Sequence, residues 1–575
     1  MKLINFYRNI IKEAILNCGY ELDKVELMYT SRPDLGQFQC NDSMKLARKY
    51  KKSPYLIAKE IVENLKYYKE FTNLNVAKPG FINISFSDEV IIKYLKYNFV
   101  QKTDKSKKIF IDYGGANIAK TLHVGHIRSA NIGEALKRLC VYLGNDVISD
   151  VHLGDWGLQI GMVIYEIKQR YPDLPCFSKS FNNSDIEFKL TSKDLEYLYP
   201  IASRKANENK EIMDEVRLIT NNLQLGHKGY VKLWKRISEV SKIEIKNIYD
   251  RLNVKFDLWE GESDAAKYID EMMEYLKLKK LIYENNGAIV MNVDRPSDNE
   301  PIPPLILKKS DGSDLYSTTE LASLYYRVRK FCPDEIWYVV DKRQSLHFKQ
   351  VFRAAYISEI VPKNIKLHFI GFGTMNGENG KPFKTREGKA MTLSTLIDVI
   401  KDEVSKNLST NVEKERSKVS EIISISVLKC ADLCANVETD YTFDPIKFSQ
   451  LNGKTGIYLL YSALRIKSLL KKADKHDLES LNLSSITCNL MRDIILKLLN
   501  FENILNNSFE EKSLHKILEY LFELNGMYNN FYSKNKILSE KDTKKRKSWL
   551  SLSKEIYDVN LKLLNILAID LPYRL

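Results

Sequence analysis

The 575-residue chain lacks the features that mark membrane, secreted and metal-scaffolded proteins. It offers no run of about 18 consecutive apolar residues, which excludes a membrane-spanning helix. Its eight cysteines are scattered, and the one close pair, Cys430 and Cys434, follows a helical pattern without a second pair to complete a metal site. We therefore expect reduced thiols and no structural metal.

Export signals, repeats and biased tracts are missing as well. Residues 1–24 carry Glu13 and Asp23 within an amphipathic pattern, instead of the continuous apolar run of a signal peptide. The chain shows no fixed repeat period and no low-complexity tract, which excludes solenoid and disordered classes. We expect a soluble, cytoplasmic protein.

What is present is typical of a globular chain with several domains. Apolar residues make up 44% and charged residues 28%, and the length exceeds what one hydrophobic core usually supports. Lys and Arg number 88 against 74 Asp and Glu, for a net charge of +14. This excess favours a polyanionic partner such as nucleic acid, although a lysine-rich proteome would give the same balance.

The pattern of apolar residues divides the chain into three predicted domains. Residues 1–106 mix helical periodicity with a short alternating strand after Pro79, which predicts an N-terminal α+β domain. Residues 107–411 alternate apolar strands with helices, which predicts a parallel, Rossmann-like α/β domain with a mostly helical insertion at about residues 170–300. Residues 412–575 show helical spacing alone, which predicts a C-terminal all-α bundle.

Two histidines in the short motif HVGH carry the clearest chemical signal. His123 and His126 follow a predicted strand at residues 109–113 and open a helix, and their i, i+3 spacing places both imidazoles on one face of its first turn. A helix N-terminus favours phosphate, and the imidazoles can hydrogen-bond oxygens that gain charge as pyrophosphate departs. Gly125 leaves room for a purine against the backbone.

This motif is informative because it is rare. A chain of this composition should contain His-x-Gly-His roughly 0.005 times by chance. The alternative is a pair of helix-capping histidines that bind no ligand. In its context between a strand and a helix, the motif predicts an ATP site.

The residues around HVGH resemble one family. Residues 117–129, NIAKTLHVGHIRS, are similar to the HIGH element of class I aminoacyl-tRNA synthetases, and to its arginyl form in particular. Other segments that resemble the arginyl family follow in family order and cover nearly the whole chain: KPGFINI, VHLGDWGLQIG, LYSTTELA, YVVDKRQSLHF and TGIYLLYSALRIKSLL. The chain is therefore identified as resembling bacterial-type arginyl-tRNA synthetases.

The resemblance implies a ligase that activates L-arginine with ATP and transfers it to the 3′-terminal ribose of tRNA(Arg), releasing AMP and diphosphate. ATP would be a substrate, with Mg²⁺ expected on its phosphates. The N-terminal domain would contact the outer corner of tRNA, and the C-terminal bundle would bind the anticodon. We expect a monomer.

A second candidate for phosphate binding lies in the Gly-rich loop GKPFKTREGKAMTL, residues 380–393. It carries Lys381, Lys384 and Arg386, which could hold a polyphosphate, although such a basic loop is commonly only solvated. The loop resembles the KMSKS element of class I synthetases in a degenerate FKTR form. In relatives with that form, a lysine just before the first HIGH histidine supplies the missing charge, which implies catalytic roles for Lys120 and Lys384.

The resemblance also implies an arginine pocket. A guanidinium is a planar fork of donors with a permanent charge, so its pocket needs carboxylates and a flat partner. Glu262 and Glu320 would hold the guanidinium beside the ring of Tyr316, although a single Glu is more commonly a solvated helix residue. Three further residues would bind the α-amino and α-carboxylate groups: Asp112, Asn117 and Gln344.

The chain departs from its relatives within this pocket. They usually have Asp at position 320 and often Glu at position 112, so each carboxylate differs by one methylene. The loop GGAN at residues 114–117 replaces a more usual SSPN and gives a more flexible backbone. These departures predict an altered affinity for arginine.

Two other functions fit part of the pattern. Another class I synthetase or a pantothenate-type ligase would share the nucleotide motif, but a ligase would not need the long helical C-terminal domain. A silent paralogue would bind tRNA or a protein without chemistry, which the intact HVGH motif and Lys384 argue against. The basic run KKRK at residues 544–547 is a candidate phosphate contact or a solvated face.

Overall fold

The protein forms two compact units. The computed structural model describes residues 3–30, 35–97, 106–178, 181, 188–310, 312–377, 380, 381, 383, 391–406 and 413–574. Unit 1 comprises Met1–Lys102, Ser462–Asn507 and Glu519–Leu561, and unit 2 comprises Thr103–Tyr461, Ser508–Leu518 and Lys562–Leu575. Within the described ranges, we find no helix with the length and apolarity that a bilayer crossing requires.

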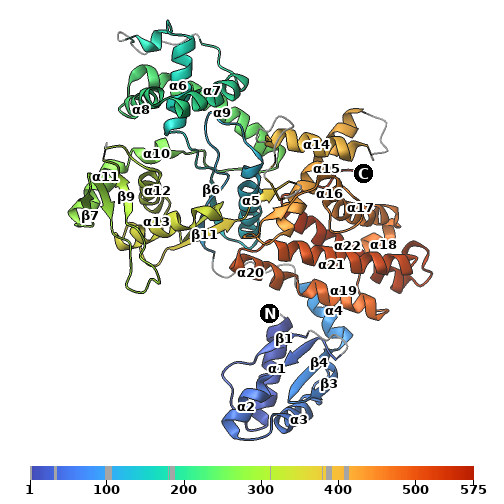
Figure 1. Ribbon diagram of the computed structural model, residues 1–575. Coiled ribbons are helices and arrows are strands. Elements are labelled where there is room, and N and C mark those ends of the chain that lie inside the picture. The colour runs from blue at the N-terminus through green and yellow to red at the C-terminus, as the bar shows by residue number, and fades with distance from the viewer. Residues whose placement is uncertain are drawn as a thin grey trace. The chain divides into compact units, whose positions relative to one another are not determined.

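The N-terminal part of unit 1 is an antiparallel sheet covered by helices, which confirms the α+β prediction (Figure 1). Its strand order is β1-β2-β4-β3, and the ring of Tyr7 stacks on that of Phe86 at 4.0 Å between centroids in the core. The strands are β1 (Leu27–Tyr29), β2 (Phe38–Cys40), β3 (Phe71–Ala77) and β4 (Phe81–Phe86). The helices are α1 (Leu3–Asn17), α2 (Asp42–Tyr50), α3 (Pro54–Leu65) and α4 (Asp88–Tyr97).

The C-terminal segment is helical, as predicted. Its helices are α17 (Gly456–Lys472), α18 (Lys475–Glu479), α19 (Asn489–Leu499), α20 (Phe501–Glu511), α21 (His515–Lys534) and α22 (Thr543–Ile566). The basic run at residues 544–547 begins α22, and several of its cations have partners nearby. Arg546 Nε lies 2.6 Å from Asp477 Oδ2, and Lys545 Nζ lies 2.9 Å from Glu540 Oε2. These pairings reduce the charge that the run offers to phosphate.

A parallel sheet forms the centre of unit 2 and confirms the predicted α/β domain. Its strands are β5 (Lys108–Asp112), β6 (Asp146–Asp150), β10 (Glu335–Asp341) and β11 (Lys366–Phe372), in the order β11-β10-β5-β6. Helix α5 (Ile127–Tyr142) packs against β5, β6 and β10 (Figure 1). Because β6 and β10 lie on opposite sides of β5, the sheet has a switch point where parallel α/β folds bind ligands.

The predicted insertion is helical over most of its length but ends in a sheet. Helix α6 (Leu158–Arg170) precedes it, and its own helices are α7 (Ser192–Glu208), α8 (Lys210–Gln224), α9 (Lys228–Arg251), α10 (Glu262–Ala266) and α11 (Ile269–Leu278). An antiparallel sheet follows: β7 (Ile282–Asn285), β8 (Ala288–Met291) and β9 (Leu305–Lys308). Asn286 and Gly287 join β7 to β8 with φ of 49° and 78°, as a type I′ hairpin requires. This Asn-Gly pair was the sequence signal for the hairpin.

Seven further elements of unit 2 follow the insertion or lie among the later strands of the parallel sheet. They are α12 (Tyr316–Phe331), α13 (Ser345–Ile357), β12 (Met375–Asn376), α14 (Leu393–Ser405), α15 (Glu413–Cys434), β13 (Tyr441–Thr442) and α16 (Pro445–Phe448). The pairing of β13 with β12 shows that a short strand occurs after residue 412, where helical spacing alone was predicted. Phe110, Ile336 and Tyr338 extend from the sheet into a buried apolar core shared with α12 and α13.

Candidate functional site

A cavity of about 490 Å³ opens at the carboxyl ends of β5, β10 and β11. Its lining comes mainly from three stretches of chain, residues 114–129, 339–344 and 372–376. The cavity therefore lies at the switch point of the sheet, and its volume suits a nucleotide-sized ligand.

The histidines of HVGH lie side by side in the wall of this cavity. A 3-10 turn, η1 (Val124–His126), precedes α5, and His123 caps it by accepting the N–H of Gly125 at Nδ1, at 3.0 Å. His126 Nδ1 lies 3.2 Å from the backbone N of His123, and the ring centroids are 4.0 Å apart. Because Nδ1 of His123 accepts a hydrogen bond, the neutral ring carries its proton on Nε2, which is left as a donor for a ligand.

Both imidazoles are held in the neutral form. Burial, followed by the neighbouring His123, lowers the pKa of His126 to about 3. Burial, followed by the charge of Lys120, lowers the pKa of His123 as well. Neutral imidazoles can donate hydrogen bonds to phosphate oxygens but cannot balance phosphate charge, so cations must come from elsewhere in the site.

The basic loop is joined directly to the HVGH turn. Val124 N donates to Met391 O at 3.3 Å, and Leu393 N donates to Leu122 O at 2.9 Å, so the end of the loop pairs with the motif like a short strand. Lys381 is exposed, and its carbonyl accepts a hydrogen bond from Gly377 N at 2.8 Å. Lys384 and Arg386, which the sequence assigned to ATP, lie outside the described residues.

Lys120 lies beside the insertion. Its ammonium group is 4.8 Å from the centroid of the Tyr199 ring in α7, and Lys120 is not among the described residues that line the large cavity. The next residue, Thr121, donates from its hydroxyl to Glu196 Oε1 at 3.0 Å and fixes the same segment to α7. Lys120 still lies near enough to His123 and His126 to lower the pKa of both.

Acidic residues gather next to the cavity. Glu320 of α12 is 1% exposed, and its Oε2 has no hydrogen-bond partner among the described residues. Glu262 begins α10, and burial raises its pKa to about 7. Tyr316, 43% exposed at the start of α12, stacks on His347 with ring centroids 4.8 Å apart. A buried carboxylate oxygen without a hydrogen-bond partner is costly, so this arrangement favours a cationic ligand.

Two amide side chains complete the predicted pocket. Asn117 Oδ1 accepts from Gln159 Nε2 at 3.2 Å, and its backbone bridges to Gly154 after β6. Gln344 ends a 3-10 turn, η3 (Lys342–Gln344), and its buried Oε1 has no partner within the part of the chain that the structure describes. Both line the cavity.

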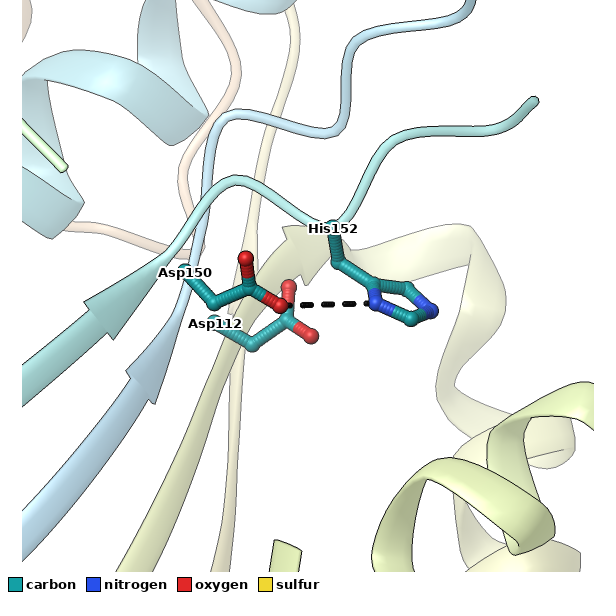
Figure 2. Close-up of side chains that lie close together, drawn as sticks. All are labelled: Asp112, Asp150 and His152. Carbon is teal, nitrogen blue, oxygen red and sulfur yellow. Dashed lines mark ion pairs between the residues drawn. The ribbon is translucent and has the colours of Figure 1, made fainter. Parts of the chain in front are cut away.

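Asp112 belongs to a buried charge network that the sequence analysis did not find (Figure 2). Arg327 Nη2 of α12 lies 2.7 Å from Asp112 Oδ2 and 2.9 Å from Asp150 Oδ2, at the ends of β5 and β6. Asp150 Oδ2 also lies 3.5 Å from Nδ1 of His152. Burial raises the pKa of Asp112 to about 6, against the opposite effect of Arg327.

The guanidinium of Arg327 already supplies the positive charge that a metal ion would bring to these carboxylates. Ligand-type atoms of Asp112, Asp150 and His152 lie within 4.8 Å of one another. The guanidinium already contacts both carboxylates, stacks 4.6 Å from the Phe110 ring centroid, and is 1% exposed. A second cation there would meet its charge at close range, so the network is an internal ion cluster.

A sequence signal for the network did exist. The strands at residues 108–112 and 146–150 both end in aspartate, and parallel neighbours bring their carboxyl ends to the same sheet edge. Arg327 gave no such signal, because a helical arginine is usually solvated.

Comparisons with known proteins agree in every segment of the chain. Residues 5–86 match the family model described as arginyl tRNA synthetase N terminal domain, residues 89–445 the model of the class I (R) tRNA synthetase catalytic domain, and residues 459–575 the DALR anticodon binding domain. Arginine–tRNA ligases of Alkaliphilus oremlandii and Francisella tularensis subsp. novicida are 41% and 40% identical to the chain, and each alignment covers 100% of both proteins.

Solved structures of arginyl-tRNA synthetases are also similar to the chain over its whole length. The crystal structure of arginyl-tRNA synthetase from Plasmodium falciparum matches with a TM-score of 0.80 at 25% identity, covering 100% of both chains. Arginyl-tRNA synthetase of Thermus thermophilus shares the fold, with a TM-score of 0.77 at 17% identity and the same coverage.

Proposed function

The chain belongs to the arginyl-tRNA synthetase family, and from that premise we propose how its cavity and acidic pocket carry out the reaction. The protein is an arginine–tRNA ligase. It activates L-arginine with ATP to arginyl-adenylate, releases diphosphate, and transfers the arginyl group to the 3′-terminal ribose of tRNA(Arg), releasing AMP. The observation that supports the arginine site best is the buried carboxylate of Glu320, whose Oε2 lacks a partner among the described residues.

The acidic pocket binds the substrate through its charge. Glu320 and Glu262 accept hydrogen bonds from the guanidinium, and Tyr316 packs its ring beside that planar group. Asn117 and Gln344, both in the cavity wall, bind the α-amino and α-carboxylate groups. Asp112 completes this set from the end of β5, where its carboxylate is held by Arg327. The substrate carboxylate then faces the nucleotide cavity.

ATP occupies the cavity at the switch point. The Nε2–H groups of His123 and His126 donate to phosphate oxygens that gain charge as the bond to diphosphate breaks. An arginine carboxylate oxygen attacks the α-phosphorus in line, the new P–O bond forms, and diphosphate leaves with the electron pair of the broken bond. The 2′-hydroxyl of the terminal adenosine of tRNA next attacks the arginyl carbonyl carbon and forms the ester bond. The bond from that carbon to the phosphate oxygen breaks, AMP leaves with its electron pair, and the hydroxyl proton passes to the departing phosphate or to water. Neither step needs a covalent enzyme nucleophile.

Mg²⁺ accompanies the phosphates of ATP. The carboxylate among the described cavity-lining residues, Asp341, is paired with Arg343 Nη2 at 2.6 Å, so it is not available as a strong ligand. A bound Mg²⁺ would therefore rely on the phosphate oxygens of ATP and on water more than on this carboxylate. It would neutralise charge on the departing diphosphate.

Gly125 is required by the imidazole next to it as well as by the nucleotide. A Cβ at this position would lie 2.8 Å from Cε1 and 2.9 Å from Nδ1 of His123. We expect Gly125→Ala to lower the rate of pyrophosphate exchange by at least about 10-fold, because the ring must leave its donor geometry. Gly157→Ala, whose Cβ meets no atom within 4 Å, is the matched control and should keep the wild-type rate. Equal rates in the two variants would contradict this role.

Lys120 supplies positive charge to the phosphates together with Lys381, Lys384 and Arg386 of the loop. For this its ammonium group moves from Tyr199, 4.8 Å away, towards the bound nucleotide. We expect Lys120→Ala to lower kcat for pyrophosphate exchange about 100-fold, because charge developing in the transition state loses a cation. The KM for arginine should change little.

The neighbouring ring provides the control for this change. Tyr199→Leu removes the cation–π partner but keeps the lysine, so exchange should stay within about threefold of wild type. Unchanged kcat in Lys120→Ala, or an equal loss in both variants, would remove Lys120 from phosphate binding.

The domains divide the work on tRNA. Residues 1–106 contact the outer corner of tRNA, residues 107–411 catalyse the reaction, and residues 412–575 bind the anticodon region. We place the enzyme in the cytoplasm. We also propose a monomer, since the ATP cavity is lined by residues of this one chain.

Pyrophosphate exchange tests the function directly. With tRNA and ATP present, exchange should depend on L-arginine and on no other amino acid. Exchange with a different amino acid would favour another class I synthetase, and exchange with none would favour a silent paralogue.

A further inference from the structure

His152 interacts with Asp150 and Asp112 of the buried charge network and with Glu320, one of the carboxylates proposed to bind arginine. It follows β6, and its backbone is left-handed, with φ of 39°. Nδ1 lies 3.5 Å from Asp150 Oδ2, and Nε2 lies 3.4 Å from Ser323 Oγ of α12. A left-handed conformation is uncommon for a residue other than glycine, so the surroundings must hold this buried side chain in place.

The charges around His152 do not balance. Four carboxylates, each from a different element, act on His152 or on one another, and they are opposed by one guanidinium, that of Arg327 of α12. The carboxylates are Asp112 of β5, Asp150 of β6, Glu262 of α10 and Glu320 of α12. Asp155, which lies near Glu262, accepts hydrogen bonds from Ser263, and the hydroxyl of Tyr338 accepts from Arg327 at 3.2 Å. An unliganded pocket with this composition must take up protons or bind a cation.

We propose that the His152 imidazolium is the counter-ion of the empty arginine pocket, and that the charge of bound arginine replaces its proton. The inference rests on the proposed function and adds a positioning residue to it. The proton passes from the imidazolium to solvent, and no covalent bond changes. After the proton has left, neutral His152 still contacts Asp150, and the Glu320 carboxylate pairs with the guanidinium of arginine in place of the imidazolium.

The titration of the site agrees with this geometry. Burial and the charge of Arg327 both oppose protonation of His152. Three carboxylates outweigh them and raise its pKa to about 9: Asp150, Asp112 and Glu320. Below that pH the proton is present and must be displaced, so the affinity for arginine rises with pH. One displaced proton gives at most about a tenfold gain in affinity per pH unit.

The replacement of the His152 proton by the charge of arginine also affects the discrimination between arginine and neutral analogues. Citrulline has the shape of arginine but carries a neutral urea, so it cannot displace the proton by charge. Discrimination between arginine and citrulline should therefore increase as the pH rises from 7 to 9, because only arginine binding is coupled to proton release.

Calorimetry of the full-length protein measures the proton directly. L-arginine is titrated into the protein at pH 8, in phosphate and in Tris, whose different heats of ionisation report the protons released. We expect release of about one proton with arginine and almost none with citrulline. This measurement on the wild-type protein does not depend on whether any variant folds.

Histidine NMR identifies the group that loses the proton. His152→Asn keeps the left-handed backbone, which Asn tolerates, and its missing Cε1–H signal identifies His152. Arginine should shift that signal from the imidazolium to the neutral position, and citrulline should not. His368→Asn is the control, because His368 also pairs with a carboxylate, 3.1 Å from Glu335 Oε2, but that carboxylate is not one of those that act on His152. It should release the wild-type number of protons.

The outcomes separate this inference from the function. If arginine binds and supports exchange while the His152 signal stays at the imidazolium position, His152 is not the counter-ion and the ligase function stands. If arginine gives neither heat nor exchange, both fail.

Discussion

Glu320→Gln should lower kcat/KM for arginine about 1,000-fold in pyrophosphate exchange, because the buried charge that we propose binds the guanidinium is replaced by a neutral amide. Most of the loss should be in KM, since the guanidinium stays bound throughout the reaction. Glutamine has nearly the same shape, so packing around this 1% exposed side chain is kept. The free protein should stay folded, because the amide keeps the volume of the carboxylate that it replaces.

Two measurements distinguish this effect from misfolding. Exchange is measured with arginine as the varied substrate, and the melting temperature is followed by calorimetry. Glu239→Gln provides the control, because that side chain of α9 is 65% exposed and remote in sequence from the motifs, and it should behave as wild type. A loss in kcat/KM of less than about 10-fold, with the variant folded, would show that Glu320 does not bind the substrate guanidinium.

Arg327→Gln should destabilise unit 2 by about 3–5 kcal/mol, because removing one partner of a buried ion cluster leaves uncompensated charge. Two carboxylates lose their cation, Asp112 at 2.7 Å and Asp150 at 2.9 Å. Arg327→Lys keeps the charge but loses the planar guanidinium, whose Nη2 contacts both carboxylates while Nη1 donates to the Tyr338 hydroxyl, so it should recover only part of the loss. Differential scanning calorimetry can follow the transition of the unit that contains the sheet.

The dependence on pH has a defined sign. In wild type the pKa of Asp112 is already raised to about 6 by burial, and loss of Arg327 would raise it further. A carboxyl group whose folded pKa exceeds its unfolded value near 4 favours the folded state at low pH, and that advantage disappears as the pH rises through the folded pKa. The loss in free energy of unfolding caused by Arg327→Gln should therefore be smaller at pH 5 than at pH 8.

A double variant tests the assignment. Asp112→Asn in the Arg327→Gln background removes one uncompensated charge and should restore part of the stability, although arginine binding would suffer. A destabilisation below about 1 kcal/mol in Arg327→Gln, independent of pH, would mean that the network does not need the guanidinium.

The nucleotide half of the site could be predicted from the sequence because its signals are local. HVGH contains both histidines and the glycine that His123 needs, the structure keeps them together in one turn, and α5 begins directly after it. The parallel sheet and the helical C-terminal segment were predicted for the same reason, since apolar periodicity is a local property. The sheet at residues 282–308 was missed although Asn286 and Gly287 marked its hairpin.

The acidic network could not be predicted in this way. Arg327 is 177 residues from Asp150 in the chain, and the two side chains meet only because α12 packs against the ends of β5 and β6. No spacing rule indicates that a helical arginine will be buried, or that the histidine after a strand will lie against a buried aspartate.

The sequence by itself therefore determined the family and the class of fold and predicted the residues of the ATP site, because each depends on neighbours along the chain. The tertiary structure alone decided which charges are buried together, that Arg327 holds Asp112 and Asp150, and that Lys120 lies against Tyr199. The physical reason is that the pKa and the net charge of a pocket depend on distance and burial, which arise when remote segments pack.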